Sequence, residues 1–176
     1  SGRHAEPHRF LGAHAAREGR RSGVVVRAFH PDAAACELLA AGRDPQPMEP
    51  VEALGVFQAF VAGAKPPLAY RLRFTFANGS TWERDDPYRF LPTLGDVDLH
   101  LFNEGTHRRV WEVLGARALQ HDGVEGTAFA VWAPNAARVS VVGDFCRWDG
   151  RLLPMRRMGA SGVFELFVPG VHAGAL

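Results

Sequence analysis

The chain has 176 residues, of which 47% are hydrophobic and 22% are charged, and its formal net charge is +1. This composition is that of a folded globular protein rather than a disordered one. The near-neutral charge argues against a nucleic-acid binder that neutralises phosphates, and it gives no reason to expect an anionic membrane partner. No apolar run approaches the roughly 20 residues of a transmembrane helix, and residues 1–10 lack the apolar core of a secretory signal. Because the chain also has only two cysteines, we expect a protein of the reducing cytoplasm.

The sequence contains an internal repeat. Residues 11–15 (LGAHA) resemble residues 114–118 (LGARA), an offset of 103 residues. Residues 55–63 (GVFQAFVAG) match residues 162–170 (GVFELFVPG) at an offset of 107, so the second copy has about four extra residues between the two blocks. Chance similarity of alanine-rich segments is the alternative. Because glycines, prolines and aromatic residues coincide in order, we favour a duplicated building block.

The first copy reads as a series of short strands. Alternation of apolar and polar residues, with glycine and proline at the ends of the runs, is typical of strands. Asn78-Gly79 is a preferred hairpin turn, and a return strand is expected around Trp82. The predicted strands of this copy are residues 24–29, 36–39, 56–61 and 70–76.

The second copy repeats this pattern after a different junction. Its predicted strands are residues 129–133, 139–142 and 163–168. Residues 95–102 alternate and are expected to be extended. Thr106 is expected to cap a helix from about His107 to Leu114, the one good helix candidate of the chain. We expect Trp111 on this helix, and Trp132 in its strand, to pack in the core.

These elements predict an all-β fold class: two tandem immunoglobulin-like β-sandwiches, the second incomplete, joined by a segment with one short helix. The expected divisions are a tail (1–9), a first sandwich (10–92), a linker with the helix (93–122) and a second sandwich (123–176). Leu176 corresponds to about Leu68 of the first copy, so the counterpart of a two-strand hairpin is missing. We therefore expect a fragment of a longer protein, whose second unit is poorly stable in isolation.

Catalytic constellations are absent from the sequence. It has no G-x-S-x-G, no P-loop and no glycine-rich dinucleotide turn after a strand. Two carboxylate pairs, Asp85-Asp86 and Asp96/Asp98, lie at loop ends or on an exposed strand face, so we expect solvated or capping carboxylates. No catalytic residue and no cofactor is expected.

Three histidines, His4, His8 and His100, are candidate metal ligands. His4 and His8 have a spacing that a helix could use for a metal, but Pro7 lies between them in a polar tail, which favours flexible histidines. Asp98 and His100 could share one strand face, where a hydrogen bond is favoured over a metal. We expect no metal site.

The tryptophans are better candidates for binding. Trp148 lies in residues 143–150 (GDFCRWDG), a polar loop flanked by glycines. An aromatic ring on a sandwich loop, with Asp144 and Asp149 beside it, suits the apolar face of a pyranose ring and its hydroxyl groups. Trp82, just after the Asn78-Gly79 turn, is the second candidate. The alternative for both rings is a packing role.

Residues 126–150, with AVWAPNA and VVGDF, resemble the family-48 carbohydrate-binding module of alpha-amylase-superfamily enzymes. The junction at residues 86–105 (DPYRFLPTLGDVDLHLFNEG) is similar to that of bacterial 1,4-alpha-glucan (glycogen) branching enzymes, which carry two tandem N-terminal β-sandwiches. Residues 161–170 fit the same family. The resemblance covers the chain from Pro7 onward.

This resemblance implies a function for the parent protein. Branching enzymes cut an α-1,4-glucan and transfer the cut chain to a 6-hydroxyl, with an Asp nucleophile and a Glu acid/base on a catalytic barrel. No Asp or Glu here matches that motif, so the fragment itself is expected to lack the active site. The implied partners are the barrel of the parent and α-1,4-glucan or glycogen, with a role in positioning glucan or setting the transferred chain length.

The resemblance carries over to few residues. Trp148 matches the loop tryptophan that stacks on glucan, but Cys146 replaces an asparagine of that motif. Trp82 matches a second stacking position in the first copy, and neither copy has the complete pair. One exposed stacking contact contributes about 1 kcal/mol, so only millimolar binding is expected. Two alternatives stay open: a stand-alone α-glucan-binding or regulatory module, and a purely structural spacer.

Overall fold

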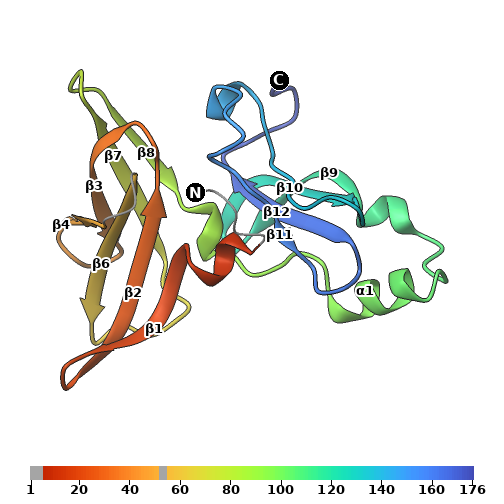
Figure 1. Ribbon diagram of the computed structural model, residues 1–176, viewed down its shortest axis with the longest axis horizontal. Coiled ribbons are helices and arrows are strands. Elements are labelled where there is room, and N and C mark those ends of the chain that lie inside the picture. The colour runs from red at the N-terminus through yellow and green to blue at the C-terminus, as the bar shows by residue number, and fades with distance from the viewer. Residues whose placement is uncertain (1–5, 52–54) are drawn as a thin grey trace. The chain divides into compact units, whose positions relative to one another are not determined.

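The computed structural model describes residues 6–51 and 55–176. The chain divides into two compact units, one of residues His8–Arg89 and one built on Phe90–Leu176. The described residues form mostly antiparallel strands in three four-stranded sheets, with one α-helix among them (Figure 1). This confirms the all-β fold class. His4 and residues 1–5 of the predicted tail lie outside the described residues.

The first unit is a sandwich of two sheets, with strand orders β1-β2-β6-β5 and β4-β3-β7-β8. Both sheets are antiparallel throughout, and the central pairs, β2–β6 and β3–β7, join strands that are not consecutive in the chain. The strands are β1 (Gly12–Glu18), β2 (Arg21–Phe29), β3 (Ala33–Ala40), β4 (Gln46–Pro47), β5 (Glu49–Pro50), β6 (Val56–Ala62), β7 (Tyr70–Phe76) and β8 (Thr81–Asp85), with the short 3-10 helices η1 (Pro7–Arg9) and η2 (Pro87–Arg89).

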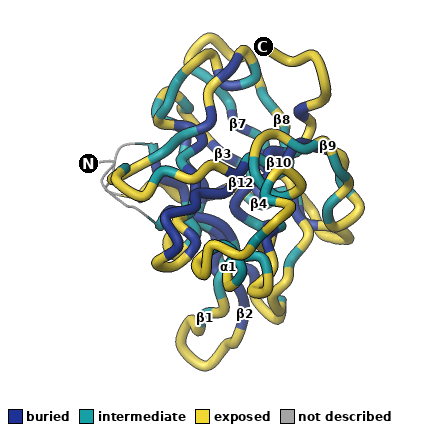
Figure 2. The backbone as a smooth tube through the Cα atoms, turned by 90° about the vertical axis from the view of Figure 1, so that its right-hand side faces the viewer, coloured by how far each residue is buried: buried dark blue, intermediate teal, exposed yellow. Residues whose placement is uncertain are grey.

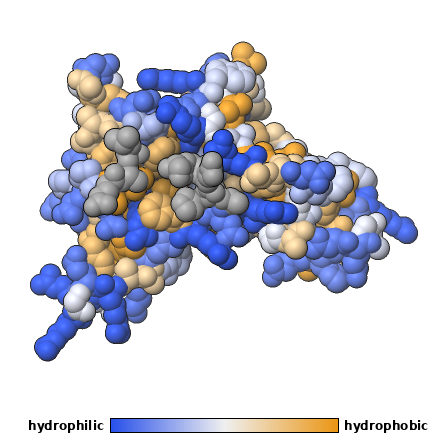
Figure 3. Space-filling view, in the orientation of Figure 1, coloured by the Kyte–Doolittle hydropathy of each residue, from blue (hydrophilic) through white to orange (hydrophobic). Residues whose placement is uncertain are grey.

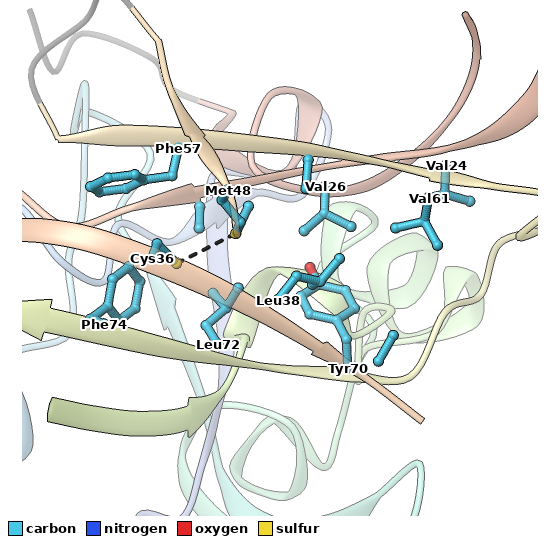
Figure 4. Packing of buried hydrophobic residues seen from close by; sticks show 13 residues of the cluster. Val24, Val26, Cys36, Leu38, Met48, Phe57, Val61, Tyr70, Leu72 and Phe74 are labelled. Carbon is cyan, nitrogen blue, oxygen red and sulfur yellow. Dashed lines mark hydrogen bonds between the residues drawn. The ribbon is translucent and has the colours of Figure 1, made fainter. Parts of the chain in front are cut away.

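One hydrophobic core fills the space between these two sheets. Figure 4 shows Val26 of β2 facing Leu38 of β3 across this core, and Phe57 of β6 facing Phe74 of β7. Side chains alternate between the two faces of a strand, so every second residue of β2 and β7 turns inward. The alternation that predicted strands at residues 24–29 and 70–76 is therefore the pattern of the core, and Figure 2 shows burial concentrated along the strands.

The second unit has one four-stranded sheet, with the order β11-β12-β10-β9. Its elements are α1 (Asp96–Asn103), η3 (Val110–Glu112), β9 (Gly115–His121), β10 (Val124–Trp132), η4 (Asp144–Cys146), β11 (Arg156–Arg157) and β12 (Val163–Pro169). In the described residues this unit therefore has one sheet where the first unit has two.

Both faces of this sheet are buried. On one face Ala128 of β10 and Phe167 of β12 pack against Phe90, which precedes the sheet in the chain. On the other face Phe164, Leu166 and Val168 are almost completely buried. Burial along β12 is therefore continuous from Val163 to Val168 rather than alternating, because both sides of the strand are covered.

The two four-stranded sheets β1-β2-β6-β5 and β9-β10-β12-β11 share one topology. The pair Gly12↔Arg27 in β1–β2 has its counterpart in Gly115↔Ala130 of β9–β10, at the offset of 103 residues found in the sequence. The pairs of β2–β6 and β5–β6 recur in β10–β12 and β11–β12 at the offsets of 103 and 107. Equal strand order and equal register confirm that the chain contains a duplicated building block.

A glycine occupies the same register position in both copies for the same steric reason. A Cβ atom on Gly23 would lie 2.4 Å from the carbonyl oxygen of Val61, and one on Gly126 would lie 2.5 Å from that of Val168. Both distances are far inside van der Waals contact. The close packing of the neighbouring strand therefore requires glycine at these two positions.

Residues 139–142 do not form the predicted strand. Ser140 makes one isolated bridge to Pro154, at the place where Glu37 pairs with Pro47 in the first copy. The counterpart of β3 in the second copy is thus reduced to this single bridge. In the first copy β3 is held along its length by β7, and the described residues of the second copy contain no strand in that place.

The junction prediction was wrong about which segment is helical. Residues 95–102, expected to be extended, contain helix α1, whereas residues 107–114 contain only the 3-10 turn η3. Leu99 and Phe102 explain the difference, because their spacing of three residues lets one helix face pack on the sheet. Asp98 near the helix N-terminus accepts the backbone N–H of Gly95 at 3.3 Å, which favours helix over strand.

The predictions for Trp111 and Trp132 were also wrong. Trp111 is 69% exposed and Trp132 is 55% exposed. Trp132 lies at the last position of β10, where the buried face of that strand ends, and its ring contacts that of Phe102 edge-on at 6.1 Å. The helix expected around Trp111 does not form, so its ring has no helix face on which to pack against the core.

Candidate functional site

The candidate site is the loop at residues 143–150 of the second unit. It folds into η4, followed by Arg147 and Trp148, both in the left-handed region with φ of 53° and 58°. Non-glycine residues reach this region only when the surroundings hold them there. Here the backbone N–H of Trp148 donates to the carbonyl oxygen of Gly143 at 2.9 Å, and that of Arg147 donates to Asp144 at 3.1 Å.

The side chain of Trp148 is exposed and held in place at the same time. The residue is 60% exposed, and its Nε1–H donates to Oδ1 of Asp144 at 2.7 Å. The bond anchors the edge of the indole, so the ring keeps its orientation without being covered. A fixed aromatic surface is suited to stacking on an apolar ligand face, since little side-chain freedom is lost on binding.

The two predicted carboxylates have different partners in this loop. Asp144 orients Trp148, while Asp149 forms an ion pair with Arg151, whose Nη2 lies 2.6 Å from Oδ2. Oδ1 of Asp149 also accepts the backbone N–H of Arg151 at 2.9 Å. Asp144 and Asp149 thus lie in the same loop as Trp148, and the carboxylate of each already has a partner within the protein.

Cys146 faces the interior of the second unit. Its residue is 1% exposed, and its Sγ lies 3.3 Å from the carbonyl oxygen of Gly143. A side chain placed there does not reach a ligand on the outer surface. The departure from asparagine at this position therefore affects the packing beneath the loop.

Trp82 lies in the first unit, in surroundings unlike those of Trp148. It is half-buried on β8 and packs against the sandwich core, with its ring 5.8 Å from that of His30 and 6.4 Å from that of Phe74. The guanidinium of Arg84 lies 4.8 Å above the ring, in cation–π geometry. One face of this ring is therefore already occupied by the protein itself.

The carboxylates at the end of β8 are structural. Asp86 is buried rather than solvated, which corrects the expectation for this residue, and the hydroxyl of Tyr70 donates to its Oδ2 at 2.5 Å. Its Oδ1 accepts the backbone N–H of Tyr88 at 3.0 Å, so it does cap the chain. Burial raises the pKa of the Asp86 carboxyl above its usual value. Asp85 pairs instead with Arg89 at 2.9 Å.

The histidine pairings differ from those expected. Asp98 contacts Nε2 of His107 at 3.1 Å, not His100, because the segment is helical and His100 lies on a different side of it, beside Glu104. The described residues contain no group of three or more His, Cys, Asp or Glu side chains placed to hold a metal ion. No helix in the described part of the chain is long and apolar enough to cross a membrane.

Comparison with known proteins gives two family matches. Residues 1–88 match the model described as alpha-1,4-glucan branching enzyme GlgB, N-terminal domain. Residues 113–176, which include the Trp148 loop, match carbohydrate-binding module 48, the isoamylase N-terminal domain. The two matches together cover both copies of the repeat.

Similar full-length proteins are named 1,4-alpha-glucan branching enzyme GlgB. That of Myxococcus xanthus is 51% identical over 174 residues, which are 98% of this chain and 23% of the relative. That of Roseobacter denitrificans is 47% identical over 178 residues, 100% of this chain and 24% of the relative. That of Rubrobacter xylanophilus is 51% identical over 177 residues, 100% of this chain and 23% of the relative. The chain therefore spans about a quarter of the length of these relatives.

Proposed function

Since the chain belongs to the family of N-terminal domains of alpha-1,4-glucan branching enzyme GlgB, we propose that it is the non-catalytic N-terminal region of such an enzyme. The parent protein would transfer cut α-1,4-glucan chains to form α-1,6 branches. In this proposal the two units help to position glucan and set the length of the transferred chain, and the catalytic barrel of the parent is their partner. A cytoplasmic location is part of the proposal.

The observation that carries the glucan-binding part is the exposed ring of Trp148, tied to Asp144. An α-glucan can stack the apolar face of a glucose ring on a flat aromatic surface, and its hydroxyl groups can donate hydrogen bonds to nearby acceptors. The carboxylates of Asp144 and Asp149 lie within the same loop and have lone pairs to accept such bonds. The ring and the two carboxylates together form the smallest unit that could recognise a sugar.

The proposed binding is weak. A single stacking contact at an exposed site contributes about 1 kcal/mol, which corresponds to millimolar affinity at best. Trp82 contributes less to the proposal than Trp148, because Arg84 lies over its ring and His30 meets its edge. Glucan would therefore have to engage this region while held elsewhere on the parent enzyme, where a weak contact gains from high local concentration.

Retention on glycogen tests the proposal directly. Wild type, Trp148→Ala and Trp111→Ala are co-sedimented with glycogen and compared. Trp111 is the matched control, because it lies in the same unit and is 69% exposed, but among the described residues it makes no hydrogen bond to a carboxylate. We expect loss of retention for Trp148→Ala alone. Equal retention of all three proteins, or equal loss in both variants, contradicts glucan binding at this loop.

The same experiment separates the two alternatives from the proposal. If no protein is retained, the spacer reading is favoured. If retention depends on Trp148, the parent sequence after Leu176 decides between a branching enzyme and a stand-alone module. A catalytic barrel with the Asp nucleophile and Glu acid/base of this superfamily is the expected result. The 98–100% coverage of this chain by branching enzymes supports that outcome.

A further inference from the structure

The first unit has a surface hollow at the end of the β1–β2 hairpin. Its volume is about 430 Å³. Most of its lining is small and apolar, and three polar side chains stand among these residues. The lining residues are Ala15, Ala16, Arg17, Ser22, Gly23, Ala64, Lys65 and Pro66.

Strand register explains why Arg17 faces this hollow without a partner. Arg17 lies directly opposite Ser22 in the β1–β2 ladder, whereas the next pair is Glu18 opposite Arg21. Neighbouring pairs point to opposite faces of the sheet, so the glutamate is directed to the other side. Arg17 therefore shares its face with an uncharged hydroxyl.

Arg17 and Lys65 are unpaired cations. Across residues 6–51 and 55–176, neither side chain takes part in an ion pair or a hydrogen bond. Two other arginines of this unit do pair with acids: Arg71 with Glu83 at 2.6 Å and Arg73 with Glu37 at 3.2 Å. Figure 3 shows strongly hydrophilic side chains gathered at the hairpin tip, which Figure 2 shows to be exposed. The hollow thus carries two positive charges that the protein does not neutralise.

The second copy of the building block lacks this chemistry. At the offset of 103 residues Gln120 stands for Arg17 and Glu125 stands for Ser22, and at 107 His172 stands for Lys65. The same register position is therefore neutral or acidic there. Because the backbone pairing is equivalent, the positive hollow is a property of the first copy and does not follow from the fold itself.

We propose that this hollow binds a phosphate group. Two cations from separate segments match the charge of a phosphate dianion. The guanidinium of Arg17 can donate two parallel hydrogen bonds to the phosphate oxygens, and the ammonium of Lys65 acts as a point charge. The hydroxyl of Ser22 supplies a further donor. The side chains of Ala15, Ala64 and Pro66 in the lining offer apolar contact, so a phosphate monoester with an apolar body fits better than phosphate alone.

The test is a titration of the 176-residue chain, followed by backbone amide NMR at constant ionic strength, with inorganic phosphate and with phenyl phosphate as the probes. We expect saturable shifts at residues of the hollow, with a Kd on the order of 1 mM, since exposed charge pairs are weak. Tighter binding of phenyl phosphate indicates a monoester as the ligand, and equal binding indicates free phosphate. Either result supports the site.

Variants taken from the second copy keep the test independent of folding. Arg17→Gln and Ser22→Glu introduce residues that the same register already holds in β9–β10. We expect about tenfold weaker binding for Arg17→Gln and for Lys65→Met, and no saturation for Ser22→Glu. Arg20→Gln, which removes the same charge at the hairpin tip outside the hollow, should change the Kd less than about twofold. Absence of saturation in wild type, or equal effects of Arg20→Gln and Arg17→Gln, overturns the proposal.

Discussion

Arg156 and Glu165 pair with each other across β11 and β12, and their side chains form an ion pair at 3.0 Å in which Glu165 is fully buried. Oε1 of Glu165 also accepts the backbone N–H and the hydroxyl of Thr93, at 3.0 and 2.8 Å. Arg156 in turn donates to the carbonyl oxygen of Phe90 at 2.9 Å. This pair therefore fastens the segment before α1 to the sheet of the second unit.

Removing one member of this pair should destabilise the second unit strongly. For Glu165→Ala we expect a loss of about 3–5 kcal/mol in the free energy of unfolding, because Arg156 is left buried without its counter-charge. Glu165→Gln should cost less, since glutamine keeps an acceptor for Thr93 and is the residue, Gln58, that the first copy has there. Urea unfolding followed by tryptophan fluorescence measures both. Equal losses in the two variants would contradict this, because they would show that the lost charge carries the whole effect and that the acceptor for Thr93 contributes nothing.

Alanine at the repeated strand glycine should be costly in both copies. In Gly23→Ala and Gly126→Ala the new Cβ would lie within 2.4 and 2.5 Å of a backbone oxygen on the neighbouring strand. We expect losses of more than about 2 kcal/mol in each, typical of forced overpacking. Gly95→Ala is the control, because its Cβ would find its nearest neighbour, Oδ2 of Asp98, at 3.7 Å. Thermal unfolding that is unchanged in Gly126→Ala would contradict the steric explanation.

Much of the fold could be predicted because strand signals are local. The repeated blocks at residues 55–63 and 162–170 both became strands in the same register, since alternation, glycine ends and strand pairing agreed there. The segment at 95–102 was misread because its polar–apolar alternation imitates a strand. Its helical form is decided by the packing of Leu99 and Phe102 against the sheet, which is a tertiary contact.

The candidate site was only partly accessible to sequence reasoning. The exposure of Trp148 could be predicted from its polar loop. Its hydrogen bond to Asp144 depends on the left-handed backbone of Arg147 and Trp148, which no local sequence pattern predicts. The hollow beside Arg17 was not foreseen. The sequence does contain the difference between Arg17 and Gln120 at equivalent positions of the repeat. That difference indicates a positive hollow only once the strand register shows which side chains share a face with Arg17.

The buried carboxyl of Asp86 should give the first unit a distinctive pH dependence. Its pKa is raised in the folded state, chiefly by burial and against the hydrogen bonds from Tyr70 and Tyr88. A raised folded pKa means that the group's contribution to stability is complete below its unfolded value of about 3.9 and is lost as the pH rises through the folded pKa. Wild type should therefore lose stability relative to Asp86→Asn as the pH increases across this interval. Urea midpoints measured at several pH values give this difference, and a constant difference would contradict it.

The two cysteines should report the opening of the two units separately. Cys36 lies in the core of the first unit and Cys146 beneath the loop of the second, and both are buried free thiols. Burial, reinforced by the negative charges of Asp86 and Glu37, raises the pKa of the Cys36 thiol to about 12, so almost no reactive thiolate exists at neutral pH. We expect slow labelling by iodoacetamide in the native chain and fast labelling in urea.

Single-cysteine variants make this a measurement of each unit. Cys146→Ser leaves Cys36 to report on residues His8–Arg89, and Cys36→Ser leaves Cys146 to report on the unit built on Phe90–Leu176. Glu165→Ala should accelerate labelling of Cys146 and leave that of Cys36 unchanged, because the buried ion pair belongs to the second unit alone. Coincident acceleration at both thiols would mean that the two units unfold as one cooperative body.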